Sequence, residues 1–112
     1  MHSGTCRDFA SHGYIVFSID HKDGTSLYHE NEDGTGIVFD NSMIAYDLDY
    51  RKSLMKIREN EVTELINELY LNEVLLKEKL GFKEGVKLDL DKLVMGGHSF
   101  GGITALSVTN ID

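Results

Sequence analysis

The pentapeptide at residues 97–101, Gly-His-Ser-Phe-Gly, constrains the fold of this 112-residue chain more than any other feature. It follows the apolar run 93–95 and precedes a helix-like segment at 103–108. A serine between two glycines, after a strand and before a helix, is typical of a sharp turn that exposes the serine hydroxyl group. Glycine is expected on both sides because a Cβ atom there would strike the neighbouring strand or helix. The pattern predicts a nucleophile elbow, with Ser99 as a catalytic nucleophile.

Two apolar segments read as strands. Residues 13–20 are aromatic and β-branched with little alternation, which is the pattern of a strand buried on both faces of a parallel sheet. Residues 92–97 have the same character and lead into the elbow. Between the first strand and the next regular element, residues 21–41 carry three glycines and no sustained period, so we predict a loop there.

A long helix is predicted between the two strands, from about residue 47 to residue 80. Apolar side chains recur there at i, i+3, i+4 and i+7, namely at Val62, Leu65, Ile66 and Leu69. Gly81 is the expected stop, with Lys77 and Lys79 in the last turn where the helix dipole favours positive charge. The order strand, helix, strand, helix predicts a parallel βαβ crossover and hence an α/β fold.

The composition narrows the classes of function. The chain has 11 Lys and Arg against 19 Asp and Glu, a formal charge of −8, and no basic cluster longer than Arg51-Lys52. Binding to nucleic acid is therefore disfavoured. Cys6 is the single cysteine and has no partner at a zinc-ligand spacing, so we expect a structural thiol rather than a disulfide or a metal site. The chain has neither a long apolar run nor the features of a signal peptide at its first residues.

Several stretches resemble one family of enzymes, the plasma and intracellular type II platelet-activating factor acetylhydrolases. They are Phe-Ala-Ser-His-Gly-Tyr-Ile-Val at 9–16 with His-Lys-Asp-Gly at 21–24, Ile-Arg-Glu-Asn-Glu-Val at 57–62, Leu-Asp-Leu-Asp-Lys-Leu at 88–93, and the elbow with Gly102. The resemblance spans nearly the whole chain. It implies a partial α/β-hydrolase fold, with parallel strands, a long crossover helix and a nucleophile elbow. Because a domain of this kind commonly exceeds about 200 residues, residues 1–112 are expected to be its central part.

The resemblance also implies an activity. The family hydrolyses the acetyl, short or oxidised acyl ester at the sn-2 position of a glycerophospholipid, without a metal or organic cofactor. Ser99 would be the nucleophile, and the backbone amide of Phe100 would form part of the oxyanion hole. The order Ser, Asp or Glu, His in this fold places the acid and the base after residue 112, so we expect these 112 residues alone to be inactive. A phospholipid substrate and peripheral contact with lipid surfaces or lipoproteins follow, and the location stays open between secreted and cytoplasmic.

The same residues also allow other interpretations. Ser99 could simply cap the following helix, and His98 could be mistaken for a general base, although adjacent residues on a sharp turn point apart. A second group of side chains could suggest a metal site, but their spacing fits no common ligand motif and solvated loop residues are favoured. That group comprises His21, Asp23, His29 and Glu30.

Two rival functions remain open at the level of sequence. The first is a different carboxyl-ester hydrolase with the same elbow, such as a lipase or a relative of dienelactone hydrolase. The second is a non-catalytic binding module that keeps the α/β-hydrolase fold.

Overall fold

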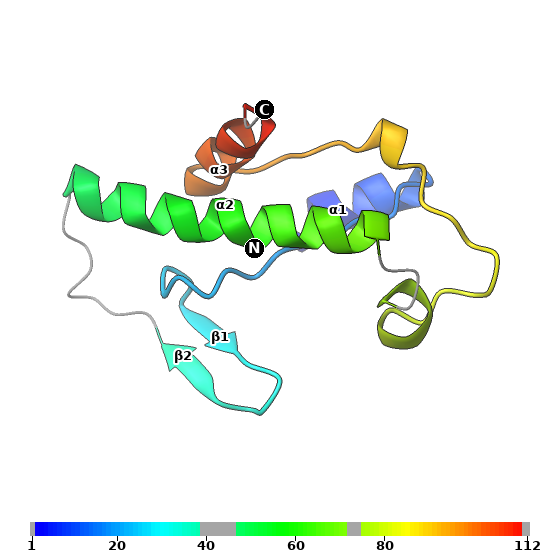
Figure 1. Cartoon of the computed structure of the whole chain (residues 1–112), viewed down its shortest axis with the longest axis horizontal. Coiled ribbons are helices and arrows are strands. Elements are labelled where there is room, and N and C mark those ends of the chain that lie inside the picture. The colour runs from blue at the N-terminus through cyan, green and yellow to red at the C-terminus, as the bar shows by residue number, and fades with distance from the viewer. Residues whose placement is uncertain (1, 39–46, 72–74, 111–112) are drawn as a thin grey trace. The chain divides into compact units, whose positions relative to one another are not determined.

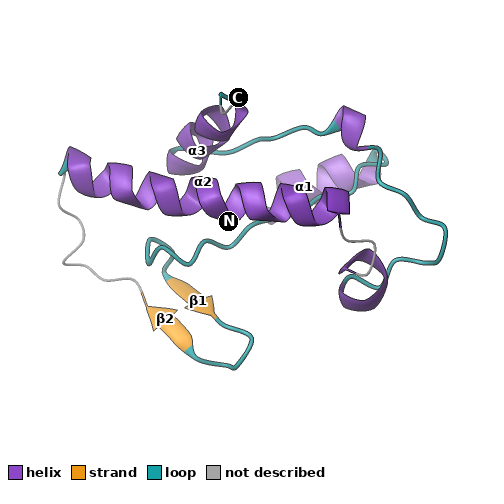
Figure 2. Ribbon diagram, in the orientation of Figure 1, coloured by secondary structure: helices purple, strands orange, loops and turns teal. Residues whose placement is uncertain are grey.

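The computed structural model describes residues 2–38, 47–71 and 75–110. The chain divides into two compact units, Met1–Asp40 and Asn41–Asp112. Helices make up most of the regular structure, and the strands belong to one antiparallel pair (Figure 2). None of the helices in the described ranges combines the length and the apolar character needed to cross a membrane.

The first unit begins with helix α1 (Ser3–Ser11), which the sequence analysis did not predict. The chain turns out of it through backbone hydrogen bonds from His12 and Gly13 to the carbonyl groups of Phe9 and Ala10. The ring of Tyr14 then packs edge-on against the ring of Phe9, with the centroids 5.7 Å apart and the planes at 86°. This contact joins the end of α1 to the start of the following extended segment.

A hairpin of β1 (Tyr28–Glu30) and β2 (Gly36–Val38) follows, so the prediction of a loop is wrong for these residues (Figure 1). The strands are antiparallel, with Tyr28 opposite Val38 and Glu30 opposite Gly36. Residues 31–35 connect them, and the amide of Asn31 donates to the carbonyl of Thr35 at 2.9 Å. The hairpin was missed because its strands are only three residues long and carry no apolar alternation.

The tripeptide Asp-Gly-Thr occurs twice in this unit and makes the same turn both times. At residues 23–25 the aspartate Oδ1 accepts hydrogen bonds from the threonine amide at 3.0 Å and hydroxyl at 2.7 Å. At residues 33–35 the corresponding distances are 2.9 and 2.6 Å. These bonds lower the pKa of the Asp33 carboxyl group, the threonine hydroxyl contributing most. A short polar side chain that bonds two residues onward thus shapes the loop and the hairpin tip.

The predicted strands have no strand partner within the described ranges. Residues 14–20 and 93–97 have no strand assignment, and no strand in the described residues runs parallel to another. Tyr14, Ile15 and Val94 are exposed to 51, 45 and 71% rather than buried on both faces. An apolar segment becomes a strand only when a neighbour accepts and donates its backbone hydrogen bonds. The α/β-hydrolase fold and the single domain over residues 1–112 therefore stay predictions.

The second unit is built on helix α2 (Leu48–Leu71), and the predicted long helix is confirmed over this range. Asp47 caps its start, because the carboxylate accepts a hydrogen bond from the amide of Asp49 at 3.0 Å. The predicted apolar stripe is buried at Val62 and Leu69, which are 4 and 7% exposed. Leu54 extends this stripe toward the N-terminus of the helix.

The segments after α2 lead to the elbow. A π-helical turn, η2 (Leu75–Lys79), buries Leu76, and Gly81 follows with φ +68°, as the predicted helix stop requires. The amide of Phe82 closes the turn by donating to the carbonyl of Leu76 at 2.9 Å. A short 3₁₀ turn, η3 (Leu90–Lys92), precedes the extended segment, and α3 (Phe100–Thr109) packs on α2 (Figure 1). The predicted helix from Phe100 onward is confirmed.

Candidate active site

Ser99 sits on a strained turn at the start of α3. Its φ is 55° and its ψ is −119°, and no other non-glycine residue in the described ranges has a positive φ. The turn is closed by hydrogen bonds from the amide of Gly101 to the carbonyl of His98 at 2.9 Å and from Gly102 to Ser99 at 3.0 Å. Such a conformation costs on the order of 1 to 3 kcal/mol and persists only where the surroundings enforce it.

The two glycines of the pentapeptide have different roles. A Cβ atom on Gly97 would lie 2.1 Å from the carbonyl oxygen of Gly101 and 2.7 Å from the amide nitrogen of Gly102. A Cβ atom on Gly101 would have no atom within 4 Å in the described structure. The expected close approach is therefore present at Gly97, and the expectation is wrong for Gly101 among the described residues. The backbone before Ser99, at Gly97, therefore lies against the backbone after it, at Gly101 and Gly102, and of the two glycines of the pentapeptide only Gly97 requires the absence of a side chain there.

The Ser99 hydroxyl does not cap the helix. Ser99 occupies the position before the first helical residue, but its side chain makes no capping hydrogen bond and is exposed. The interpretation of Ser99 as an ordinary cap therefore lacks the bond on which it depends. Within residues 2–38, 47–71 and 75–110, no histidine or carboxylate hydrogen-bonds to Ser99. His98, the adjacent residue, is exposed as well.

Phe100 is the first residue of α3, and its backbone amide and its side chain have different roles. The first amides of a helix have no acceptor within the helix, so the Phe100 N–H is available to a ligand beside Ser99. Its side chain is half-buried, and the guanidinium carbon of Arg58 lies 4.2 Å from the centroid of the ring. Arg58 itself is 8% exposed. Phe100 thus joins the elbow to the middle of α2.

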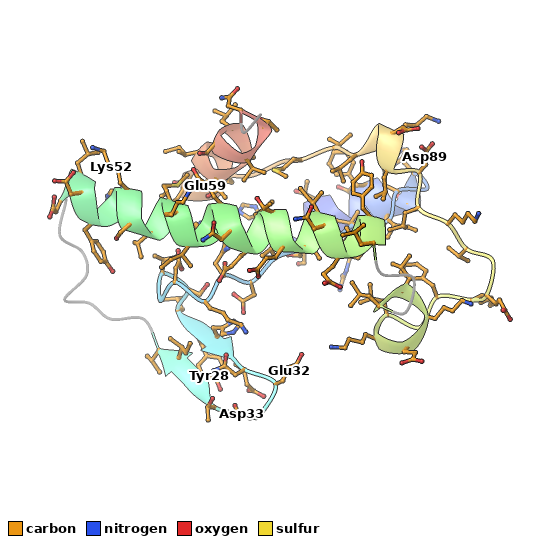
Figure 3. All side chains as sticks on the ribbon, viewed as in Figure 1. Tyr28, Glu32, Asp33, Lys52, Glu59 and Asp89 are labelled. Atoms are coloured by element: carbon orange, nitrogen blue, oxygen red, sulfur yellow. The ribbon has the colours of Figure 1, made fainter. Side chains whose placement is uncertain are left out.

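One face of α3 contacts α2 through three side chains. Phe100, Thr104 and Ser107 are spaced at i, i+4 and i+7, and residues so spaced share a helix face. Thr104 is 3% exposed, and its hydroxyl lies 3.8 Å from the sulfur atom of Met55. The hydroxyl of Ser107 donates to a carboxylate oxygen of Glu59, which is labelled on α2 in Figure 3. The elbow therefore lies at the start of a helix that contacts α2 near its first residue, its middle and its last turn.

The sequence analysis missed Arg58. The signal was present, because Leu54, Arg58 and Val62 follow one another at steps of four and all three are buried. A charged residue within an apolar stripe indicates a buried contact, here with an aromatic ring.

Of the histidine and carboxylate group His21, Asp23, His29 and Glu30, His29 pairs with a residue outside the group, Asp20. His29 Nδ1 lies 2.7 Å from Asp20 Oδ2, and Asp20 also accepts from Ser26 at 3.2 Å. His29 Nε2 is buried without a hydrogen-bond partner among the described residues. Asp23 is used in its Asp-Gly-Thr turn. No group of three or more potential metal ligands occurs within the part of the chain that the structure describes.

Comparison with known proteins decides the family. The family model for platelet-activating factor acetylhydrolase, isoform II, matches residues 1–112. The chain belongs to this family. It is also 30% identical to a platelet-activating factor acetylhydrolase of Canis lupus familiaris over 122 aligned positions, which cover 94% of this chain and 28% of that relative. The chain thus spans less than a third of the length of this relative of the acetylhydrolase family. No solved structure matches the chain.

Proposed function

We propose that Ser99 is the nucleophile of a serine esterase that hydrolyses the sn-2 acetyl, short or oxidised acyl ester of glycerophospholipids. The observation that carries the proposal is the backbone at Ser99, where a positive φ holds an exposed hydroxyl group at the start of α3. Membership of the acetylhydrolase family supports the choice of ester. The name of the canine relative supports it further.

The chemistry would be acyl transfer through the serine. The Ser99 oxygen attacks the ester carbonyl carbon while a histidine takes the hydroxyl proton, and the carbonyl oxygen becomes an oxyanion. The Phe100 N–H donates to that oxyanion, an interaction worth about 3 kcal/mol per donor in well-studied enzymes. The intermediate then expels the lysophospholipid oxygen, which receives the proton. Water hydrolyses the acyl serine in the reverse sense, which releases the carboxylic acid and restores Ser99.

A reactive serine is the first point to test. We would expose the full translation product of the transcript, alongside the 112-residue chain, to a fluorophosphonate probe that labels activated serines. Labelling is expected in the translation product and is expected to disappear in Ser99→Ala. Ser53→Ala is the matched control, because Ser53 is an exposed serine on α2 whose hydroxyl bonds only to the Tyr50 carbonyl in the described structure. Absence of labelling in the unsubstituted translation product would contradict the proposal and favour a non-catalytic binding module.

The class of substrate needs a separate measurement. Hydrolysis of phospholipids with a short sn-2 acyl group should exceed hydrolysis of those with two long chains. The same comparison on vesicles tests the proposed contact with a lipid surface. Equal rates on both, or a preference for long chains, would indicate a different carboxyl-ester hydrolase with the same elbow.

A further inference from the structure

Arg58 is placed where a charged side chain is costly. It lies in the buried stripe of α2 between Leu54 and Val62 and is only 8% exposed. A guanidinium group stays charged in proteins, so burial must be offset by favourable contacts. One of these is the face of the Phe100 ring, 4.2 Å from the guanidinium carbon to the ring centroid. Planar stacking of this kind is a property of arginine that lysine does not share.

The neighbouring residue on α2 holds the other end of α3. Glu59 accepts a hydrogen bond from Ser107, seven residues beyond Phe100, which is about 10 Å along a helix. Two consecutive residues of α2 therefore contact α3, Arg58 at the first turn and Glu59 near the last turn. The Arg58 contact is at the end that carries Ser99, and the Glu59 contact is remote from it.

We infer that Arg58 is a positioning residue, which fixes the backbone of Phe100 at the elbow by stacking its guanidinium group on the Phe100 ring. This inference rests on the proposed function of Ser99, since the position of the Phe100 amide matters through the oxyanion it would bind. The ring and the amide belong to one residue, so a contact that holds the ring also restrains the amide. Loss of the stack removes this restraint and leaves the strained turn at Ser99 with less support.

The test compares Arg58→Met with two controls. Met keeps the length and apolar packing of the side chain but lacks the charged plane. Lys52→Met removes an exposed charge from the same helix, and Ser107→Ala removes the contact at the far end of α3. In the translation product, Arg58→Met is expected to lower kcat on a short-acyl phospholipid on the order of tenfold with KM within about twofold, because a misplaced oxyanion donor weakens only the transition state. Both controls should keep kcat within about twofold.

A second readout does not depend on activity. In a uniformly ¹⁵N-labelled chain, Arg58→Met should shift the amide signals of Phe100 and Gly101 more than Ser107→Ala does. A change no larger than in Ser107→Ala, or an unchanged kcat, would overturn the positioning role. If the unsubstituted protein fails to react with the probe, the proposed function fails, and the amide signals alone decide whether Arg58 positions the elbow.

A second variant, Phe100→Leu, tests the same contact from the other side in case Arg58→Met does not fold. This substitution keeps the backbone amide and removes the ring, and circular dichroism shows which variants are folded. It should lower kcat to the same extent as Arg58→Met, and the double variant should be no slower than either single one, because the two side chains act as a unit. Additive losses would show that Arg58 acts elsewhere.

Discussion

The two units of the molecule differ in their buried apolar side chains, although the second unit also buries the polar Arg58 and Thr104. In the described residues of the second unit, the buried apolar side chains are Leu54, Val62, Leu69 and Leu76. In the first unit, the buried side chains in the described residues are those of Asp23 and His29. Burial of an aliphatic side chain stabilises by about 1.5 to 3 kcal/mol, whereas a hydrogen bond contributes about 0.5 to 1.5 kcal/mol net. The unit that holds the elbow is thus stabilised mainly by apolar burial, and the other by local polar bonds.

The largest loss of stability is expected for a substitution at Gly97, where the cause is a backbone clash rather than a change in apolar burial or side-chain hydrogen bonding. Gly97→Ala places a Cβ atom 2.1 Å from a backbone oxygen, and the backbone cannot move without opening the elbow. We expect a loss of about 4 kcal/mol in the free energy of unfolding, measured by urea denaturation. Gly101→Ala is the control, since it meets nothing within 4 Å and alanine favours a helix. Equal losses in both variants would show that the elbow does not depend on the close approach.

The next effect tests apolar burial in the second unit. Leu69→Ala removes a side chain that is 7% exposed and should lower the free energy of unfolding by about 3 kcal/mol. Leu71→Ala on the same helix removes one that is 84% exposed, and the change should stay within about 0.5 kcal/mol. Thermal or urea denaturation measures both. Similar losses in the two variants would contradict the comparison between the units.

The first unit should respond to a polar substitution instead. Asp20→Asn removes the charge that faces His29 Nδ1 at 2.7 Å. Because Asp20 is 57% exposed, solvent screens the pair, and we expect a loss of only about 1 kcal/mol. Amide hydrogen exchange in β1 and β2 measures this local stability. Glu32→Gln, an exposed change in the hairpin loop labelled in Figure 3, should leave the exchange unaltered.

The smallest effect concerns the carboxyl group of Asp33 at the hairpin tip. Its pKa is lowered chiefly by the hydroxyl of Thr35, so Thr35→Val should raise the pKa toward the ordinary value of an aspartate. The sign follows from linkage: the contribution to stability is present above the pKa of the unfolded chain and is lost as the pH falls through the lower pKa of the folded chain. Titration of the Asp33 carboxyl carbon by NMR measures the change. A pKa that stays low in Thr35→Val would assign the effect to the backbone amide.

Local patterns were enough to predict α2 and α3, but not α1. The stripe through Val62 and Leu69 is a property of neighbouring residues, and the structure buries both side chains. Gly81 has the positive φ expected of a helix stop, but it follows the separate turn η2, whereas α2 is described only to Leu71. The turn at Ser99 was also predictable, because the pentapeptide itself encodes the tight approach at Gly97. These features need no information from distant parts of the chain.

The strands and the support of the elbow could not be predicted in the same way. Residues 14–20 have strand composition, but pairing depends on which backbone lies alongside, and no local pattern specifies that. The hairpin depends on polar turns that carry no hydrophobic period. The position of Arg58 in the apolar stripe signals a buried contact, but the sequence does not identify its partner, Phe100, which lies 42 residues later.

The separation between Arg58 and Phe100 has a consequence for the order of folding. The hairpin loop closes over residues 31–35, and hairpins of this size form in about 1 to 10 μs. The contacts of α3 with α2 join residues 42 to 49 positions apart, so closing them costs more chain entropy. The hairpin should therefore form early and the elbow acquire its support late. During synthesis and refolding, the strained turn at Ser99 should therefore become secure only after the hairpin has formed.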